Sequence, residues 1–138
     1  MDFLPIFKNY KNIAVYGMSK NPAKPSNSVP VYLMEQGYNI IPINPTIDEI
    51  EGKKSYSKLM DVPDKIEILD VFRPSEQALS VVEEAVERKR VKGDVNLIWL
   101  QEGIISEDAK MLAEKNNIAF VQDKCMRVEY LKVNDMLL

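Results

Sequence analysis

The stretch YGMSKNPAKPSNSV, residues 16 to 29, contains residue types that could bind a phosphate group. Gly17 directly follows an apolar run, and its lack of a side chain would let a ligand approach the backbone. Hydrogen-bond donors and positive charge come from Ser19, Lys20, Lys24, Ser26, Asn27 and Ser28. The further glycines of a dinucleotide-binding loop are missing, and prolines make this loop stiffer and longer. The loop therefore predicts a ligand that binds in a more extended form than a dinucleotide.

Five short apolar runs predict the strands that would position this loop. They are almost continuously apolar, which is typical of strands buried on both faces of a parallel sheet. The runs are IAVYG (13 to 17), YNIIPIN (38 to 44), IEILDVF (66 to 72), VNLIWL (95 to 100) and IAFVQ (118 to 122).

Helical patterns lie between the predicted strands. We expect one helix from Pro74 to Arg90, and another with Ser106 as N-cap that ends at residue 116 or 117. We expect the helix between Ser26 and Gln36 to begin at residues 27 to 29, because Pro30 suits only an opening turn. The run ERKRVK, residues 87 to 92, is interpreted as cations beside a helix end. The connection over residues 46 to 65 has room for a short edge strand and one helical turn.

The order of these elements predicts one α/β domain with a doubly wound parallel sheet of strand order 2-1-3-4-5 and right-handed crossovers. In such a sheet the ligand crevice lies beyond the carboxyl ends of the strands, where the order reverses between strands one and three. The segments at those ends are the loop after Gly17, Asn44 with Pro45, Phe72 with Arg73, QEG (101 to 103) and QDKC (122 to 125).

Composition excludes several classes of function. The formal charge of −3 and a pI near 5.1 argue against a nucleic-acid partner. The absence of histidine removes the commonest general base, the commonest zinc ligand and any phosphohistidine, and we predict no metal site. Cys125 is the single cysteine, so no intrachain disulfide can form. With neither a signal-peptide pattern nor a long apolar window, we expect a soluble, cytoplasmic protein with no membrane partner.

Five motifs, in order and spacing, resemble the small stand-alone CoA-binding proteins. They are IAVYGMSKNPAKPSNSV, GYNIIPINP, ILDVFR, WLQEGI and DKCMRVEY, and the resemblance extends from about residue 11 to about residue 132. That family is Rossmann-like and similar to the N-terminal domain of the succinyl-CoA synthetase alpha subunit. The resemblance implies a single CoA-binding domain over residues 1 to 138.

The resemblance also implies a role for each residue of a CoA site. Gly17, Ser19, Lys24 and Ser26, with Pro25 between the last two, would meet the pyrophosphate. Asn44 and Pro45 would border the adenine and ribose, Phe72 and Arg73 would help clamp the phosphates, and Gln101 and Gly103 would line the pantetheine path.

Two positions depart from the family pattern. Family members often carry arginine where Lys24 stands, and lysine keeps the charge but loses bidentate geometry. They also often carry a basic residue where Thr46 stands. Recognition of the 3′-phosphate of CoA would then depend on Lys53 or Lys54 folding back towards the site.

Three functional hypotheses follow. The first is a non-catalytic protein that binds CoA or an acyl-CoA. The second is an enzyme or redox protein that uses NAD(P) or another nucleotide, with Asp70, Glu102 or Asp123 as acidic candidates; against it, the chain lacks G-x-G-x-x-G and an acidic residue at position 44. The third is a regulatory or scaffold subunit, and the sequence leaves open a homo-oligomer or a protein partner.

Cys125 has two interpretations. It is either a small buried apolar side chain, the favoured alternative, or a thiol that forms a mixed disulfide with CoA.

Overall fold

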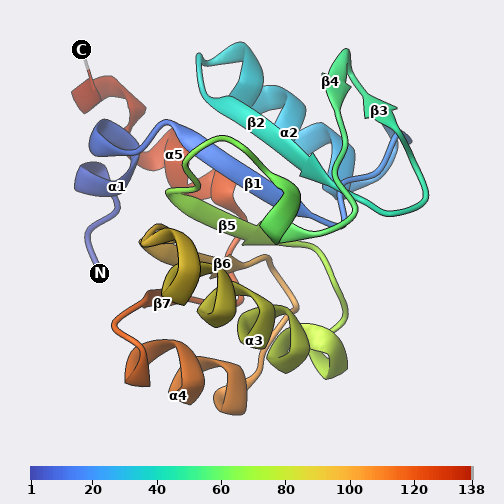
Figure 1. Ribbon diagram of the computed structural model, residues 1–138. Coiled ribbons are helices and arrows are strands. Elements are labelled where there is room, and N and C mark those ends of the chain that lie inside the picture. The colour runs from blue at the N-terminus through green and yellow to red at the C-terminus, as the bar shows by residue number, and fades with distance from the viewer. Residues whose placement is uncertain (138) are drawn as a thin grey trace.

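A five-stranded parallel sheet forms the centre of the computed structural model, which describes residues 1–137 (Figure 1). The spatial order of its strands is β2-β1-β5-β6-β7. Their bounds are Asn12–Tyr16 for β1, Asn39–Ile43 for β2, Ile68–Val71 for β5, Leu97–Leu100 for β6 and Ala119–Val121 for β7. Numbered among the five sheet strands alone, this is the predicted order 2-1-3-4-5, so the doubly wound Rossmann-like α/β fold is confirmed.

Helices cover both faces of the sheet (Figure 1). Helices α3 (Ser75–Lys92) and α4 (Glu107–Lys115) lie on one face, and α1 (Leu4–Asn9), α2 (Pro25–Glu35) and α5 (Met126–Val133) lie on the other. Along β6, Ile98 and Leu100 belong to the first buried cluster, and Leu97 and Trp99 belong to the second. The strand runs are continuously apolar because alternate side chains enter two different cores.

Helix α2 begins at Pro25, before the predicted start at residues 27 to 29. Pro30 therefore lies inside the helix, where it cannot donate the usual hydrogen bond to the carbonyl of Ser26. That carbonyl instead accepts a hydrogen bond from the Ser19 amide at 3.2 Å. The prediction of the helix start was wrong because the loop after β1 supplies the donor that proline lacks.

Two helices had no counterpart in the sequence prediction. Helix α1 has 6 residues and α5 has 8, so neither carries enough of its own helical pattern. They are held by packing: the rings of Phe7 in α1 and Tyr130 in α5 meet edge to face at 5.4 Å between centroids. Both helices cover the same face of the sheet as α2.

The connection after β2 contains the short elements that the sequence suggested. Strands β3 (Glu49–Ile50) and β4 (Lys53–Lys54) pair antiparallel as a small sheet of their own, and a 3₁₀ turn spans Leu59–Asp61. Tyr56 forms a single parallel bridge to Ile43 on the outer edge of β2. The edge of the main sheet is thus extended by one residue, not by a full strand.

The run 87–92 does not consist only of solvated cations. Arg90 is exposed and pairs with Glu87, as expected for a surface charge. Arg88 is only 2% exposed and forms an ion pair with Asp94 at 2.8 Å. Its remaining N–H groups donate to carbonyl oxygens of the connection that leads into β5, namely those of Leu59, Val62 and Asp64. The run does lie at the end of α3, with Lys89, Arg90 and Lys92 in the last turn, as predicted. The burial of Arg88 was not predicted, and it is possible because the guanidinium is fully hydrogen-bonded.

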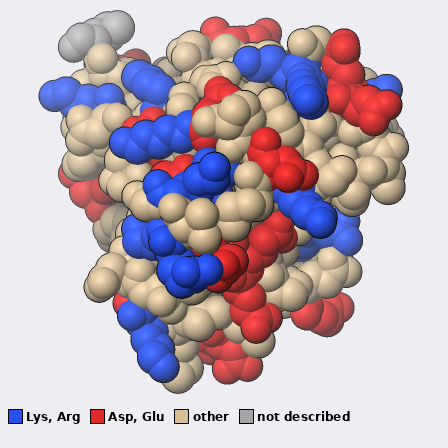
Figure 2. Space-filling view, in the orientation of Figure 1, with Lys and Arg blue, Asp and Glu red and all other residues tan. Residues whose placement is uncertain are grey.

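The surface mixes charges of both signs. Basic and acidic side chains interleave across the face shown in Figure 2. No helix within residues 1–137 is both long and apolar enough to cross a bilayer.

Candidate functional site

The carboxyl ends of β1 and β5 lie side by side at the predicted switch point of the sheet. The strands pair in parallel, with Tyr16 opposite Val71, so the loop after Gly17 and the segment after Phe72 leave the sheet together. On the other side, β1 pairs with β2, so Asn44 leaves the same edge. The topology therefore brings together the segments that the sequence assigned to a ligand site.

Gly17 is required at this edge by a close approach of the chain after β5. Its φ is +88°, and an added Cβ would lie 2.9 Å from Arg73 Cδ and 3.2 Å from the carbonyl oxygen of Phe72. Its amide donates to the carbonyl of Ile43 at 2.9 Å. A side chain here would push the ends of β1 and β5 apart.

The loop after Gly17 is fixed by hydrogen bonds to its own helix. Ser19 donates its amide to Ser26, and its carbonyl accepts from Asn27 Nδ2 at 2.8 Å. Its hydroxyl oxygen accepts from the Asn21 amide at 3.0 Å. Ser19 therefore shapes the loop, and it lines neither of the two cavities that flank this edge.

Backbone donors remain free where the loop enters α2. Within the described residues, the amides of Met18, Lys20 and Ser26 have no hydrogen-bond acceptor. Pro25 at the first helical position has no N–H, so Ser26 presents the first free amide of α2. A helix N-terminus with a free amide favours an anion.

The first cavity, of about 300 Å³, is named the α2–α5 cavity because it lies between the N-terminal ends of those helices. Its lining residues are Lys24, Pro25, Ser26, Phe72, Gln101, Glu102, Ile104 and Cys125. Lys24 is exposed, and Phe72 and Cys125 are half-buried. The favoured interpretation of Cys125 as a buried apolar side chain holds only in part: Cys125 packs against the second buried cluster, but it is half-buried because the N-cap position of α5 places it at the cavity wall.

A buried hydrogen-bond chain lies at the α2–α5 cavity. Gln101 donates from Nε2 to Asp70 Oδ1 at 2.6 Å, and its Oε1 accepts from the Met126 amide at the start of α5. Asp70 is completely buried, and its Oδ2 has no partner in the described part of the chain. Burial raises the pKa of Asp70 to about 7, although the hydrogen bond from Gln101 opposes the shift.

The second cavity, of about 330 Å³, is named the β1–α3 cavity. Its lining residues are Tyr16, Gly17, Ile43, Asn44, Pro45, Thr46, Arg73, Gln77, Ser80 and Val81. Tyr16 donates to Glu84 Oε2 at 2.6 Å, and burial followed by this hydrogen bond raises the pKa of Tyr16 to about 12. The phenol therefore stays protonated at neutral pH.

Asn44 lines the β1–α3 cavity, and its side chain is held there by three hydrogen bonds. Its Nδ2 donates to the Met18 carbonyl at 2.9 Å, which ties the end of β2 to the loop after β1. Its Oδ1 accepts from both the amide and the hydroxyl of Thr46, at 3.0 and 2.8 Å. The Asn44 and Thr46 side chains are thus engaged with one another beside the cavity.

The residues expected at one ligand site divide between two cavities. Lys24, Pro25, Ser26, Phe72 and Gln101 line the α2–α5 cavity, whereas Gly17, Asn44, Pro45 and Arg73 line the β1–α3 cavity. Ser19 and Gly103 line neither. Gly103 forms a turn with φ +85°, and its amide donates to Asp123 Oδ1 at 2.7 Å.

Lys53 and Lys54 do not reach the residues around Thr46. Lys53 donates to Asn39 Oδ1 at 2.9 Å, at the opposite end of β2. Lys54 lies over the Tyr56 ring at 5.2 Å from its centroid. The idea that either lysine folds back to this cavity is therefore not supported by their positions.

Gln77 and Ser80 were not singled out from the sequence. They lie on successive turns of α3, and both line the β1–α3 cavity. Their spacing of three residues, following Arg73, is the signal that could have identified them, since such residues share a helix face. Asp70 was named only as an acidic candidate of the NAD(P) hypothesis, and its place inside the apolar run ILDVF could have indicated burial.

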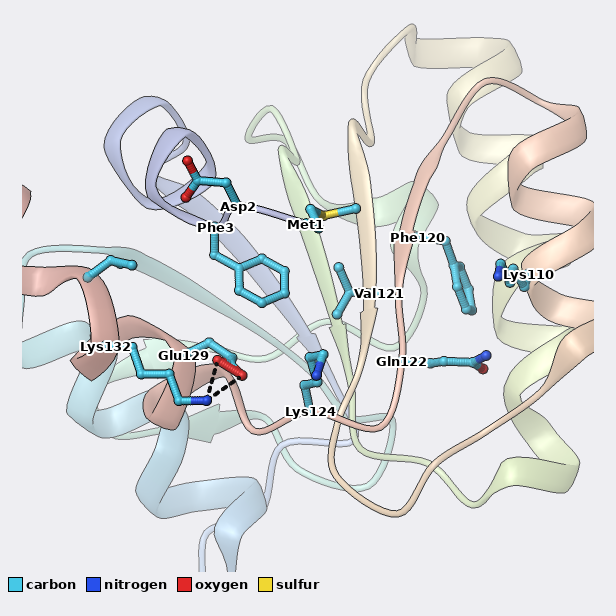
Figure 3. Close-up of a pocket in the computed structure, with 11 residues that line it drawn as sticks. Met1, Asp2, Phe3, Lys110, Phe120, Val121, Gln122, Lys124, Glu129 and Lys132 are labelled. Carbon is cyan, nitrogen blue, oxygen red and sulfur yellow. Dashed lines mark hydrogen bonds and ion pairs between the residues drawn. The ribbon is translucent and has the colours of Figure 1, made fainter.

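A third cavity, of about 530 Å³, lies at the outer edge of β7 (Figure 3). Phe3, Phe120 and Val121 are among its apolar lining residues, and Lys132 is paired with Glu129 at 3.2 Å. It shares no lining residue with the other two cavities. Within residues 1–137 no cluster of acidic or cysteine side chains could hold a metal ion.

Comparison with known proteins defines the class. A family model described as CoA binding domain matches residues 11–131, so the chain belongs to that family. The YneT protein of Bacillus subtilis is 37% identical over 125 residues, which cover 91% of this chain and 89% of YneT. The solved structure of a hypothetical protein from Pyrococcus horikoshii OT3 matches with a TM-score of 0.89 at 32% identity, covering 96% of this chain and 90% of that one.

The chain is also related to part of a larger enzyme. An ADP-forming acetate–CoA ligase of Methanocaldococcus jannaschii is 30% identical over 128 residues. The match covers 90% of this chain but 18% of the ligase. The relationship is therefore to one domain of that enzyme.

Proposed function

We propose that this chain is a single CoA-binding domain that holds CoA or an acyl-CoA at the carboxyl edge of the sheet without a catalytic step of its own. The observation that carries this proposal is the pair of cavities on the two sides of the contact between Gly17 and the Phe72–Arg73 segment. Phe72 lines one cavity and Arg73 lines the other, so the two spaces meet at adjacent residues. CoA is a long ligand, with an adenosine 3′-phosphate at one end and a thiol at the other, and it needs two such spaces.

The pyrophosphate would lie at the start of α2. Lys24 supplies the charge beside the α2–α5 cavity, and Ser26 supplies a free amide within the first turn. This arrangement combines the two features of helix-end anion sites, an unpaired donor and a favourable helix dipole. It does so without the repeated glycines of a dinucleotide loop.

The acidic candidates for catalysis have other roles in this proposal. Asp70 is completely buried beneath Gln101, and Asp123 accepts the hydrogen bond that shapes the Gly103 turn. Glu102 remains at the cavity wall as a single carboxylate. The domain would hold its ligand and leave the ligand chemically unchanged.

Thermal unfolding with added nucleotides tests the proposal. A ligand present at about 100 times its dissociation constant adds roughly 2.7 kcal/mol to the native state, which raises the melting temperature by several degrees. We expect this shift with CoA and not with NAD, because Asn44 occupies the place of the acidic ribose ligand and is engaged internally. Equal shifts with NAD and CoA, or none with millimolar CoA, would overturn the proposal.

A pair of lysine variants locates the binding. Lys24→Ala should reduce the CoA-induced shift, because Lys24 lines the α2–α5 cavity. Lys20→Ala is the matched control: Lys20 is an exposed lysine of the same loop that lines neither cavity. If the two variants lose the same affinity, the loop acts only through its overall charge.

A further inference from the structure

The two cavities each contain one cationic side chain among the described residues. Lys24 lines the α2–α5 cavity and Arg73 lines the β1–α3 cavity. CoA carries its phosphates at two separate places, a pyrophosphate in the middle of the molecule and a monophosphate on the ribose. The two cations thus lie in two separate cavities, one for each of these two groups.

Arg73 is held in the β1–α3 cavity by its surroundings. The preceding residue is anchored to β1, since the Phe72 amide donates to the Tyr16 carbonyl at 2.9 Å. The Arg73 side chain crosses Gly17, where its Cδ lies 2.9 Å from the place a Cβ would occupy. Its Nε donates to Gln77 Oε1 at 2.9 Å, which fixes the plane of the guanidinium.

The terminal nitrogens of Arg73 have no partner in the described part of the chain. Only Nε is engaged, although the guanidinium carries five N–H donors in a planar fork. Such a fork binds phosphate through two parallel hydrogen bonds. Gln77 thus orients Arg73 and leaves its phosphate-binding atoms free.

Other groups near this cavity are already engaged. The Thr46 hydroxyl donates to Asn44 Oδ1, and Lys53 is hydrogen-bonded at the far end of β2. Lys54 lies over the ring of Tyr56, which borders a different hollow on the outer edge of β2. Among the described residues that line this cavity, Arg73 is the one cation, so it can stand in for the basic residue that family members often carry at position 46.

We propose that Arg73, oriented by Gln77, recognises the ribose 3′-phosphate and makes the site select CoA over dephospho-CoA. Lys24 and the start of α2 hold the pyrophosphate, which both molecules contain. This inference rests on the proposed CoA-binding function. Arg73 is then the specificity determinant, and Gln77 is a positioning residue that acts through it.

Calorimetric titration with CoA and with dephospho-CoA tests the assignment. We expect the wild type to bind CoA about 10- to 100-fold more tightly than dephospho-CoA, as for a charge-assisted contact. Arg73→Ala should lower the affinity for CoA by that factor and leave the affinity for dephospho-CoA unchanged, so the ratio of the two affinities approaches one. Arg73→Lys should give an intermediate ratio, because lysine keeps the charge and loses the fork.

Two further variants separate this role from general effects. Lys24→Ala should lower the affinities for both ligands by the same factor and so preserve the ratio of the two affinities. Gln77→Ala should lower the ratio without changing the affinity for dephospho-CoA, which a merely structural role would not do. Arg73 and Gln77 are exposed, so unchanged melting temperatures will show that these variants fold.

Specific outcomes would overturn the inference. Equal weakening of both ligands by Arg73→Ala would place Arg73 at the pyrophosphate. A wild type that binds both ligands equally well would show that the 3′-phosphate is not recognised. In both cases CoA still binds, whereas a wild type that binds neither ligand would refute the proposed function itself.

Discussion

Replacing Asp70 with asparagine should remove a large part of the pH dependence of stability. Asp70 is completely buried, and burial raises its pKa from 3.8 to about 7. One pKa unit corresponds to about 1.4 kcal/mol, so the ionised form costs the native state about 4 kcal/mol. Asparagine is neutral at every pH and keeps an oxygen that can accept from Gln101.

The direction of this pH dependence follows from the pH at which the folded and the unfolded state each lose the proton of Asp70. Below about pH 4 the carboxyl is protonated in both states, and the cost is absent. Between about pH 4 and pH 7 only the folded state keeps the proton, so stability falls as the pH rises. Above about pH 7 the side chain is ionised in both states and the full cost applies.

Urea unfolding of the wild type and Asp70→Asn measures the effect. From about pH 5 to about pH 8.5, the free energy of unfolding of the wild type should fall by about 3 kcal/mol relative to that of the variant. Glu83→Gln, at an exposed position of α3, is the control and should follow the wild type. If the free energies of unfolding of the wild type and Asp70→Asn change in parallel with pH across this range, the reasoning is refuted.

Two other predictions concern the edge of the sheet. Gly17→Ala should lower the free energy of unfolding by roughly 1–3 kcal/mol in urea unfolding. The added Cβ would lie 3.2 Å from the Phe72 carbonyl oxygen, and alanine would have to adopt the positive φ of this position. Gly103 also has a positive φ of +85°, but a Cβ there would have no atom within 4 Å, so Gly103→Ala should lose less stability. Equal losses of stability in the two variants would contradict the steric argument. Cys125 should exchange with CoA disulfide, releasing one CoA thiolate and gaining the mass of one CoA, because it lines the α2–α5 cavity. The adduct should be absent in Cys125→Ser and reversed by a reducing agent. If an accessible control thiol reacts and Cys125 does not, the role of Cys125 is limited to packing.

Much of the fold could be predicted because its signals are local. Each strand run is continuously apolar, which indicates a parallel sheet, and the alternation of strands with helical patterns gives the order of the sheet. The same pattern places the ends of β1 and β5 together, which the pairing of Tyr16 with Val71 confirms. The five motifs gave the family, and the family model over residues 11–131 confirms it.

The sequence patterns were insufficient where a group outside a helix satisfies a polar group within it. Pro30 is tolerated inside α2 because the Ser19 amide takes the place of the missing donor. Arg88 is buried because its guanidinium is satisfied by Asp94, just past the end of α3, and by the carbonyl oxygens of Leu59, Val62 and Asp64 in an earlier segment. Helix α5 is short, so its packing against α1 and α2 outweighs its weak pattern.

The sequence by itself determined the sheet, the edge at which a ligand would bind and the residue types available there. Only the tertiary structure decided how those residues are shared, with Lys24 in one cavity and Arg73 in another. Spacing along the chain cannot reveal this division, because it arises where the segment after β5 crosses Gly17 so closely that a Cβ there would lie 2.9 Å from Arg73 Cδ. That contact joins residues more than fifty positions apart in the chain, and it exists only because the parallel pairing of β1 and β5 brings their ends together.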